Sequence, residues 1–335
     1  MSFLRRLCAL AAVGCCAAMV AALGGCGRSY HVTETYELQS NCDDNEAFLA
    51  LVVPRSGPYQ KVANLKVTWE GEAVKEVVGP NDVLRLRGAV GRQAVAVVDY
   101  DLLLADKKPH PQDRPTTAEL AAEDGIESDD PFMVHQARLL ASGTSRQDAY
   151  RIFEFVGQRI KQGQPAATNQ PPSALRAYRN CTGACEERAR LMVAILRAAG
   201  IPARKVDGLL ITRGGTQTAT WDHPAASHAW VEFFVDERWE PADPSAAAGH
   251  PSPSKFDAHG ELIAYGESNS CRATCSRLEA EARDWALPNG KMLATPSSPL
   301  RFVAASKDPA CTLVPSVTVR KLMFAPPVRG GQFGD

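Results

Sequence analysis

The stretch "TGACEERARLMVAILRAAGIPARKVDG", residues 182–208, decides the fold of the central part of the chain. Four apolar residues recur in it at helical spacing: Ala189, Met192, Val193 and Leu196. Such a stripe predicts an amphipathic helix. Gly200 suits the left-handed position that follows a helix, and Pro202 prevents the helix from continuing. The sequence therefore predicts a helix that begins at Cys185 and ends near Gly200, followed by a strand.

Cys185 lies at the start of this predicted helix, directly after "TGA". The unpaired N–H groups and the dipole of a helix N-terminus stabilise a thiolate, and Gly183 permits a tight turn and close substrate approach. A thiolate nucleophile also needs a histidine to share its proton and an acceptor to orient that histidine. Downstream, His228 opens the strand-like "HAWVEFFVD", and Asp243 follows the next strand, "RWEPAD". These three residues are therefore candidates for a catalytic triad.

The spacing separates this arrangement from one well-known class of thiol enzymes. His228 follows Cys185 by 43 residues (228 − 185), whereas papain and cathepsin proteases place the histidine roughly 130–150 residues after the cysteine. The chain instead resembles the transglutaminase-like superfamily over residues 173–245. The resemblance lies in G-x-C opening a helix, R-A-x-G-I-P-A-R, H-A-W on a strand and D-P after the next strand.

The resemblance implies an α+β, papain-like transglutaminase core, in which the Cys185 helix packs on an antiparallel sheet carrying His228 and Asp243. It also implies that Cys185 is the nucleophile, His228 the general base and acid, and Asp243 the orienting partner of the histidine. The implied chemistry is attack on a carboxamide or peptide carbonyl of a protein or peptide substrate, which gives a thioester that passes to water or to an amine.

We expect hydrolysis, as a peptidase or amidase, rather than cross-linking, because the setting is an unspecialised bacterial one. No cofactor or metal is needed for these steps, and calcium is not implied. The oxyanion would need backbone N–H groups near Cys185 and a side-chain donor. For that donor, Asn180 and Gln170 are the candidates.

Each catalytic assignment has a structural alternative. Cys185 could be a structural or disulfide-bonded cysteine, and Cys181, one helical turn before it, is expected to be one; a direct disulfide between the two would be strained. His228 could be a strand histidine, with His223 in "WDHPAAS" as the competitor, and Asp243 could be a turn residue. Trp230 and Trp239 are expected in the core.

Two other function classes stay open. Cys181-x3-Cys185 and Cys271-x3-Cys275 together offer four thiolates at tolerable zinc spacing. Alternatively, the chain could be a surface-anchored binding module of the same fold that has lost activity. The acidic run "AAEDGIESDD" lacks the ligand spacing of an EF-hand and is expected to be a solvated surface.

The N-terminus predicts export. Residues 1–25 have a basic start, an apolar run and small residues, as in a signal peptide. "LGGC", ending at Cys26, resembles the bacterial lipobox, in which the cysteine carries a diacylglycerol. Because Gly27 follows instead of aspartate, we expect an outer-membrane lipoprotein facing the periplasm. The net charge of −1 gives no support for nucleic-acid binding.

Export also limits the cysteine chemistry. Ten cysteines are present; three leave with the signal peptide and Cys26 is lipidated, which leaves six: Cys42, Cys181, Cys185, Cys271, Cys275 and Cys311. An oxidising compartment favours pairing among them, but the sequence does not give the connectivity.

The remaining chain divides by pattern. Residues 26–105 contain short, often alternating apolar segments separated by turns, which predicts a small β-sandwich-like domain. Residues 106–130 read as a linker, and residues 131–250 as the transglutaminase-like domain. Residues 251–335 read as a C-terminal extension of unknown role, with a helix in "CSRLEAEARDWAL" and a strand in "PSVTVRKLMF".

Overall fold

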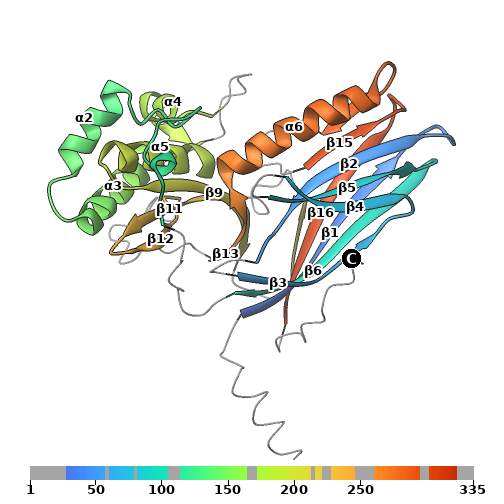
Figure 1. The fold of residues 1–335 in the computed structure, drawn as a ribbon, viewed down its shortest axis with the longest axis horizontal. Coiled ribbons are helices and arrows are strands. Elements are labelled where there is room, and N and C mark those ends of the chain that lie inside the picture. Colours follow the sequence, from blue (N-terminus) through green and yellow to red (C-terminus); the bar gives the residue numbers. More distant parts are fainter. Residues whose placement is uncertain are drawn as a thin grey trace, which may run out of the picture.

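The structure is a computed structural model that describes residues 28–56, 60–78, 81–104, 114–163, 172–212, 216–220, 228–245, 260–294 and 302–322. The predictions for the signal peptide, Cys26, Gln170 and His223 lie outside these residues, as do the side chains of Cys271 and Cys275. Figure 1 shows two parts side by side, one of helices around a small sheet and one built almost entirely of strands. Among the helices described, none is long and apolar enough to span a bilayer.

The strand-rich part is a sandwich of two five-stranded sheets, with strand orders β10-β16-β1-β6-β3 and β14-β15-β2-β5-β4. Its strands are β1 (Arg28–Gln39), β2 (Glu46–Val53), β3 (Gln60–Thr68), β4 (Glu72–Val78), β5 (Asn81–Ala89), β6 (Gln93–Leu104), β10 (Thr216–Thr220), β14 (Lys291–Ala294), β15 (Phe302–Ser306) and β16 (Thr312–Leu322). Buried and half-buried residues alternate along β1, so one face of this strand lines the core between the sheets.

The sandwich uses both ends of the chain, which corrects the predicted domain boundaries. β16 pairs with β1 from Ser29↔Leu322 to Gln39↔Thr312, and β15 pairs with β2. Residues 302–322 are therefore part of the sandwich instead of a separate extension. Pairing between segments this far apart is set by long-range packing, which local sequence patterns do not record.

Helix α6 (Ser268–Ala286) covers the outer face of the second sheet (Figure 1). Its buried Leu278, Ala282 and Ala286 belong to one cluster with Phe48 and Val303 from the sheet. The helix predicted from "CSRLEAEARDWAL" is therefore present, and it starts seven residues earlier than that segment.

The other part is an α+β unit, as the sequence predicts. Its sheet has the strand order β12-β11-β9-β13. The strands are β9 (Ala203–Thr212), β11 (His228–Val235), β12 (Arg238–Ala242) and β13 (Gly260–Glu267), and the helices are α2 (Pro131–Leu140), α3 (Ser145–Arg159), α4 (Ala174–Asn180) and α5 (Cys185–Ala198). A short 3-10 helix, η1 (Thr117–Glu119), precedes them.

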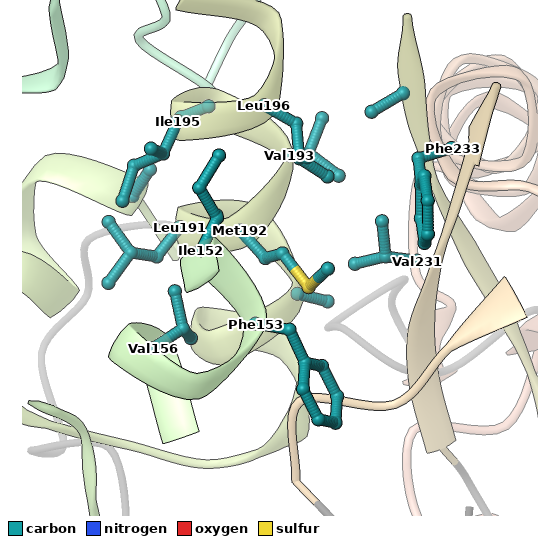
Figure 2. Close-up of a cluster of buried hydrophobic side chains, with 14 of the residues drawn as sticks. Ile152, Phe153, Val156, Leu191, Met192, Val193, Ile195, Leu196, Val231 and Phe233 are labelled. Atoms are coloured by element: carbon teal, nitrogen blue, oxygen red, sulfur yellow. The ribbon is translucent and has the colours of Figure 1, made fainter. Parts of the chain in front are cut away.

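Helix α5 is the centre of this unit. Figure 2 shows Met192 and Val193 of α5 facing Val231 and Phe233 of β11, and all four are buried in one core. The helix begins at Cys185 and ends at Ala198, and Gly200 has φ +78°, as predicted. The sequence predicts one apolar stripe, but α5 is buried almost all round, because other helices pack on the sides that the sheet leaves open.

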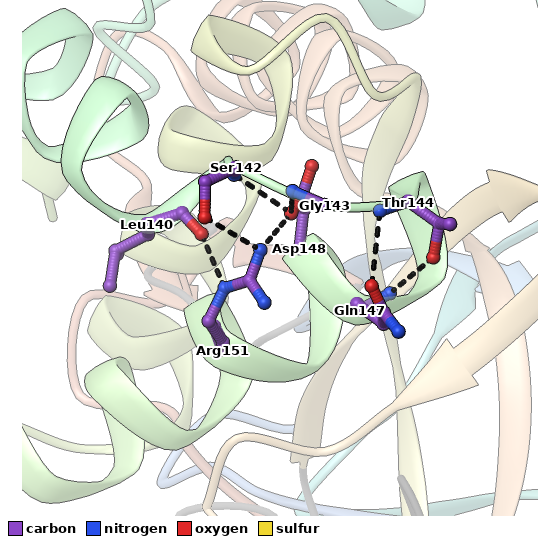
Figure 3. A network of polar contacts seen from close by, with 7 residues as sticks. All are labelled: Leu140, Ser142, Gly143, Thr144, Gln147, Asp148 and Arg151. Carbon is purple, nitrogen blue, oxygen red and sulfur yellow. Dashed lines mark hydrogen bonds and ion pairs between the residues drawn. The ribbon is translucent and has the colours of Figure 1, made fainter.

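A polar network closes the turn between α2 and α3 (Figure 3). Thr144 caps α3, and Asp148 Oδ1 accepts a hydrogen bond from the backbone N–H of Gly143 at 2.9 Å. Arg151 Nε donates to the carbonyl oxygen of Leu140, the last residue of α2, at 2.6 Å. These bonds satisfy the free ends of both helices, and so fix the hairpin that packs against α5.

Strand β9 joins the two parts. Its Ala203 belongs to the core around α5, whereas its Leu209 and Ile211 belong to the core of the sandwich. Strand β9 of the sheet that carries the candidate site therefore packs into one core near its start and into the other near its end.

Candidate active site

Strand pairing and a hydrogen bond at the helix start fix the segment before Cys185. The two-residue strands β7 (Lys161–Gln162) and β8 (Thr182–Gly183) pair in parallel. Glu187 accepts a hydrogen bond from the backbone N–H of Ala184 at 3.0 Å, which satisfies one free donor of the helix start. A Cβ at Gly183 would lie 2.6 Å from Cβ of Glu187, so this position needs glycine for close packing. Cys185 is thereby placed as the first residue of α5, partly buried against the core.

His228 and Asp243 come from neighbouring strands of the sheet that packs on α5. His228 is the first residue of β11, paired with Gly208 of β9, and Asp243 directly follows β12. His228 Nε2 and Asp243 Oδ2 are 2.7 Å apart, and both side chains are buried. The other carboxylate oxygen accepts the backbone N–H of Ser245 at 2.9 Å, which fixes the orientation of the carboxylate.

Cys185 also interacts with His228, since it is one of the two residues that raise the pKa of this histidine. Because Nε2 is paired with Asp243, we infer that Nδ1 is the ring nitrogen available to the sulfur. Burial alone lowers the pKa of His228, but the hydrogen bonds to Asp243 and Cys185 and the charges of both outweigh it, and they raise the pKa from 6.5 to about 10. At neutral pH the ring is therefore an imidazolium between a carboxylate and a sulfur, and such a cation stabilises a thiolate.

The comparisons with known proteins cover the segment that carries these three residues. Residues 136–244 match the family model of the transglutaminase-like superfamily. This segment is a transglutaminase-like domain. Over 75 residues the chain is 32% identical to an uncharacterized protein of Mycobacterium leprae, a match that spans 22% of this chain and 26% of that relative's length.

One solved structure is similar in fold over most of the chain, and a second aligns more weakly. A protein of Cytophaga hutchinsonii, provisionally assigned as a cysteine protease, aligns over 91% of this chain and 94% of its own with a TM-score of 0.58 and 13% identity. The periplasmic domain of TgpA from Pseudomonas aeruginosa aligns over 67% of this chain and 92% of its own, with a TM-score of 0.34 and 18% identity.

Cys181 is not part of the group formed by Cys185, His228 and Asp243. It is the C-cap that follows α4, in a left-handed conformation with φ +55°, and its sulfur lies 3.6 Å from the carbonyl oxygen of Tyr178. Cys181 and Cys185 are both free thiols, so of the two structural roles expected for Cys181 the structure does not show the disulfide-bonded one; Cys42 and Cys311 are free as well. Among the described residues, no cluster of histidine, cysteine or acidic side chains could hold a metal ion.

The remaining predictions for the site have different outcomes. Trp230 and Trp239 are buried, at 3% and 1% exposure, and the prediction that they belong to the core is confirmed. Asn180 is the exposed last residue of α4, and its role as an oxyanion donor stays a prediction.

Helix α5 carries a second set of charges that the sequence did not predict to be buried. Glu186 pairs with Arg190 at 2.9 Å and with Lys205 of β9 at 3.4 Å, and Lys205 pairs with Asp207 at 2.6 Å. Burial lowers the pKa of Lys205, but the charges of Asp207 and Glu186 outweigh it and raise that pKa above its usual value. The sequence gives only a weak sign of this burial, because charged residues between apolar ones usually indicate the solvent-facing side of a helix.

Proposed function

We propose that the transglutaminase-like domain is a cysteine-nucleophile enzyme that acts on peptide or amide bonds, with Cys185, His228 and Asp243 as its triad. The observation that carries the proposal is the buried His228–Asp243 pair, 2.7 Å between Nε2 and Oδ2, which leaves the other ring nitrogen to Cys185. Cys185 lies at the N-terminus of a helix, and His228 is hydrogen-bonded to an acceptor, Asp243, as nucleophilic catalysis requires.

The reaction has two halves. The Cys185 thiolate attacks the substrate carbonyl carbon, and the His228 imidazolium gives its proton to the leaving amine, so that a C–N bond breaks and a thioester remains. In the second half, neutral His228 takes a proton from a water molecule, which attacks the thioester and releases the acid and the thiolate. Asp243 stabilises the imidazolium and holds its ring in place throughout.

We favour water over an amine as the acceptor, so that the enzyme is a peptidase or amidase rather than a cross-linker. The substrate would be a protein or peptide. The lipobox-like "LGGC" and the signal-like residues 1–25 support an extracytoplasmic enzyme held at the outer membrane through a lipid on Cys26. A mass shift at Cys26 and processing that globomycin blocks would support this location, and a water-soluble mature protein would contradict it.

A thiol-reactive peptide probe tests the enzyme directly. Purified full-length protein is exposed to the probe at pH 5–6, and the labelled residue is identified by mass spectrometry. Selective labelling at Cys185 supports the proposal, since ordinary thiols are protonated in this range. Labelling at Cys181 in preference would contradict the assignment. An absence of selective labelling would favour the alternative that the domain is a binding module of the same fold.

A further inference from the structure

A cluster of aromatic rings and arginines joins α2, α3 and α4, the three helices that pack on α5 (Figure 1). We call this group the Arg–aromatic patch; its members are Phe132, Phe155, Arg159, Tyr178 and Arg179. The ring centroid of Tyr178 lies 6.4 Å from that of Phe132 and 6.5 Å from that of Phe155. The guanidinium of Arg159 lies over the ring of Tyr178, at 4.8 Å from its centroid. Arg179 lies in the same way over Phe132, at 5.7 Å, so both cations are within the range of cation–π attraction.

The patch is open to solvent, and its positive charge is not offset. Phe132 is 52% exposed, and Arg159 and Arg179 are exposed as well. Among the described residues neither arginine forms an ion pair, and Arg159 Nη2 donates to the carbonyl oxygen of Tyr178 at 3.4 Å. Asp130, the acidic residue nearest to Phe132 in the sequence, caps α2 by accepting the backbone N–H of Phe132 at 2.8 Å. The patch therefore presents two guanidinium charges that are held against rings and are available to an anion.

The patch borders the segment that leads into Cys185. Arg159 is the last residue of α3 and is followed, after one residue, by β7; Arg179 is the second-last residue of α4, which β8 follows. β7 and β8 pair in parallel, and α5 begins two residues after β8 ends. Lys161 of β7 is exposed, and its side chain forms no ion pair within the described part of the chain. Positive charge therefore continues from the patch along the strand pair that precedes the nucleophile.

We propose that the Arg–aromatic patch binds an acidic segment of the protein substrate, in the same chain as the bond that Cys185 attacks. This inference rests on the proposed function and adds a substrate class to it. Carboxylates complement the guanidinium groups, which can hold each of them with two parallel N–H···O bonds. Aromatic residues and arginine are also the types enriched where proteins bind one another. A peptide fits better than a lipid surface, because the positive charge continues along β7 toward the nucleophile.

Two thiol-reactive peptide probes test the inference. One carries glutamates on both sides of the reactive group, and the other carries glutamines at the same positions. The full-length protein is labelled at low salt and pH 7, and the labelling rate of Cys185 is followed by mass spectrometry. We expect the glutamate probe to react about fivefold faster, the size typical of two exposed ion pairs. In Arg159→Gln/Arg179→Gln we expect this advantage to disappear, and in the wild-type protein we expect it to shrink as salt is added.

Arg277→Gln/Arg320→Gln is the matched control. These two arginines are also exposed and form no ion pair among the described residues, but they lie on α6 and β16, and no ring contact holds them. The control removes the same amount of charge and should keep the preference for the glutamate probe. A preference that persists in Arg159→Gln/Arg179→Gln, or one that both double variants lose equally, would overturn the inference.

A second measurement separates this inference from the proposed function, because it needs no reactive thiol. Fluorescence anisotropy gives the affinity of the full-length protein for a hexaglutamate peptide. Binding that weakens in Arg159→Gln/Arg179→Gln, combined with no selective labelling of Cys185, would support the acidic-peptide site and refute the proposed function. Vesicles that contain phosphatidylglycerol are the third probe. Vesicle binding that depends on Arg159 and Arg179, without any binding of hexaglutamate, would overturn the inference in favour of a lipid surface.

Discussion

Two groups of buried charges lie next to each other on α5 and differ in what they can do. The group formed by Glu186, Arg190, Lys205 and Asp207 consists of anions and cations matched across α5 and β9. The group at Cys185 contains a thiol and an imidazole that is held against the carboxylate of Asp243. Burial is common to both groups, so burial alone does not mark a reactive site. The difference that we propose is that only the group at Cys185 holds a nucleophile and a base that share a proton.

The largest expected effect separates the two cysteines near the start of α5. Cys185→Ala should abolish hydrolysis of a peptide library, read by mass spectrometry, because no nucleophile remains. Cys181→Ala is the matched control and should keep most of the activity, because Cys181 ends α4 and contacts only backbone oxygens there. If Cys181→Ala is the inactive variant, the nucleophile is assigned to the wrong residue.

The next effect concerns the base. His228→Ala should lower the rate of hydrolysis by roughly 10²–10⁴, the usual contribution of a positioned general acid and base. Steady-state rates on the same peptides would measure it, with circular dichroism confirming that the variant is folded. An undiminished rate would move the role to another histidine, with His223 as the first candidate.

The matched charge group should affect stability instead of chemistry. Arg190→Met leaves Glu186 without its strongest partner inside the protein, so we expect a loss of about 3–5 kcal/mol in the free energy of unfolding, measured with urea. The double variant Glu186→Gln/Arg190→Met should recover part of this loss. Selective labelling of Cys185 should persist in the variant under native conditions. A loss of labelling in folded Arg190→Met would mean that the two groups are not independent.

The smallest effect is a pH dependence of stability that comes from His228. In a Cys185→Ala background, where no thiol titrates at the site, the folded-state pKa of His228 should remain above 6.5 because of Asp243. The folded protein then holds more protons than the unfolded chain as pH rises above 6.5, so this contribution is fully present below that pH and is lost toward higher pH. The slope is at most about 1.4 kcal/mol per pH unit.

The measurement compares urea unfolding of Cys185→Ala with that of Cys185→Ala/His228→Gln between pH 6 and 10. The stability advantage of the histidine variant should shrink as pH rises above 6.5, and it should stop changing before pH 10, because the contribution of Cys185 to the pKa is missing. An advantage that is constant over this range would show that His228 is not held as a cation by Asp243.

The sequence predicts the elements of the fold that depend on local contacts, and it does not predict those that depend on distant ones. α5, β11 and β12 follow from residues 182–245, because the apolar spacing, Gly200 and the turns between strands are local features, and the triad residues stand at the ends of those elements. The partnership of β1 with β16 does not follow, because it joins residues almost 300 positions apart. The burial of Arg190 does not follow either, because only the packing of α2, α3 and α4 around α5 covers its side of the helix.

¹⁵N NMR of the His228 ring shows directly whether this histidine is a cation held between Asp243 and Cys185. In the wild-type protein we expect both ring nitrogens to remain protonated through pH 8, with a pKa of about 10. Asp243→Asn should bring the titration down toward the usual range. A wild-type ring that is neutral at pH 8 and titrates near 6.5 would show that His228 is not held as a cation.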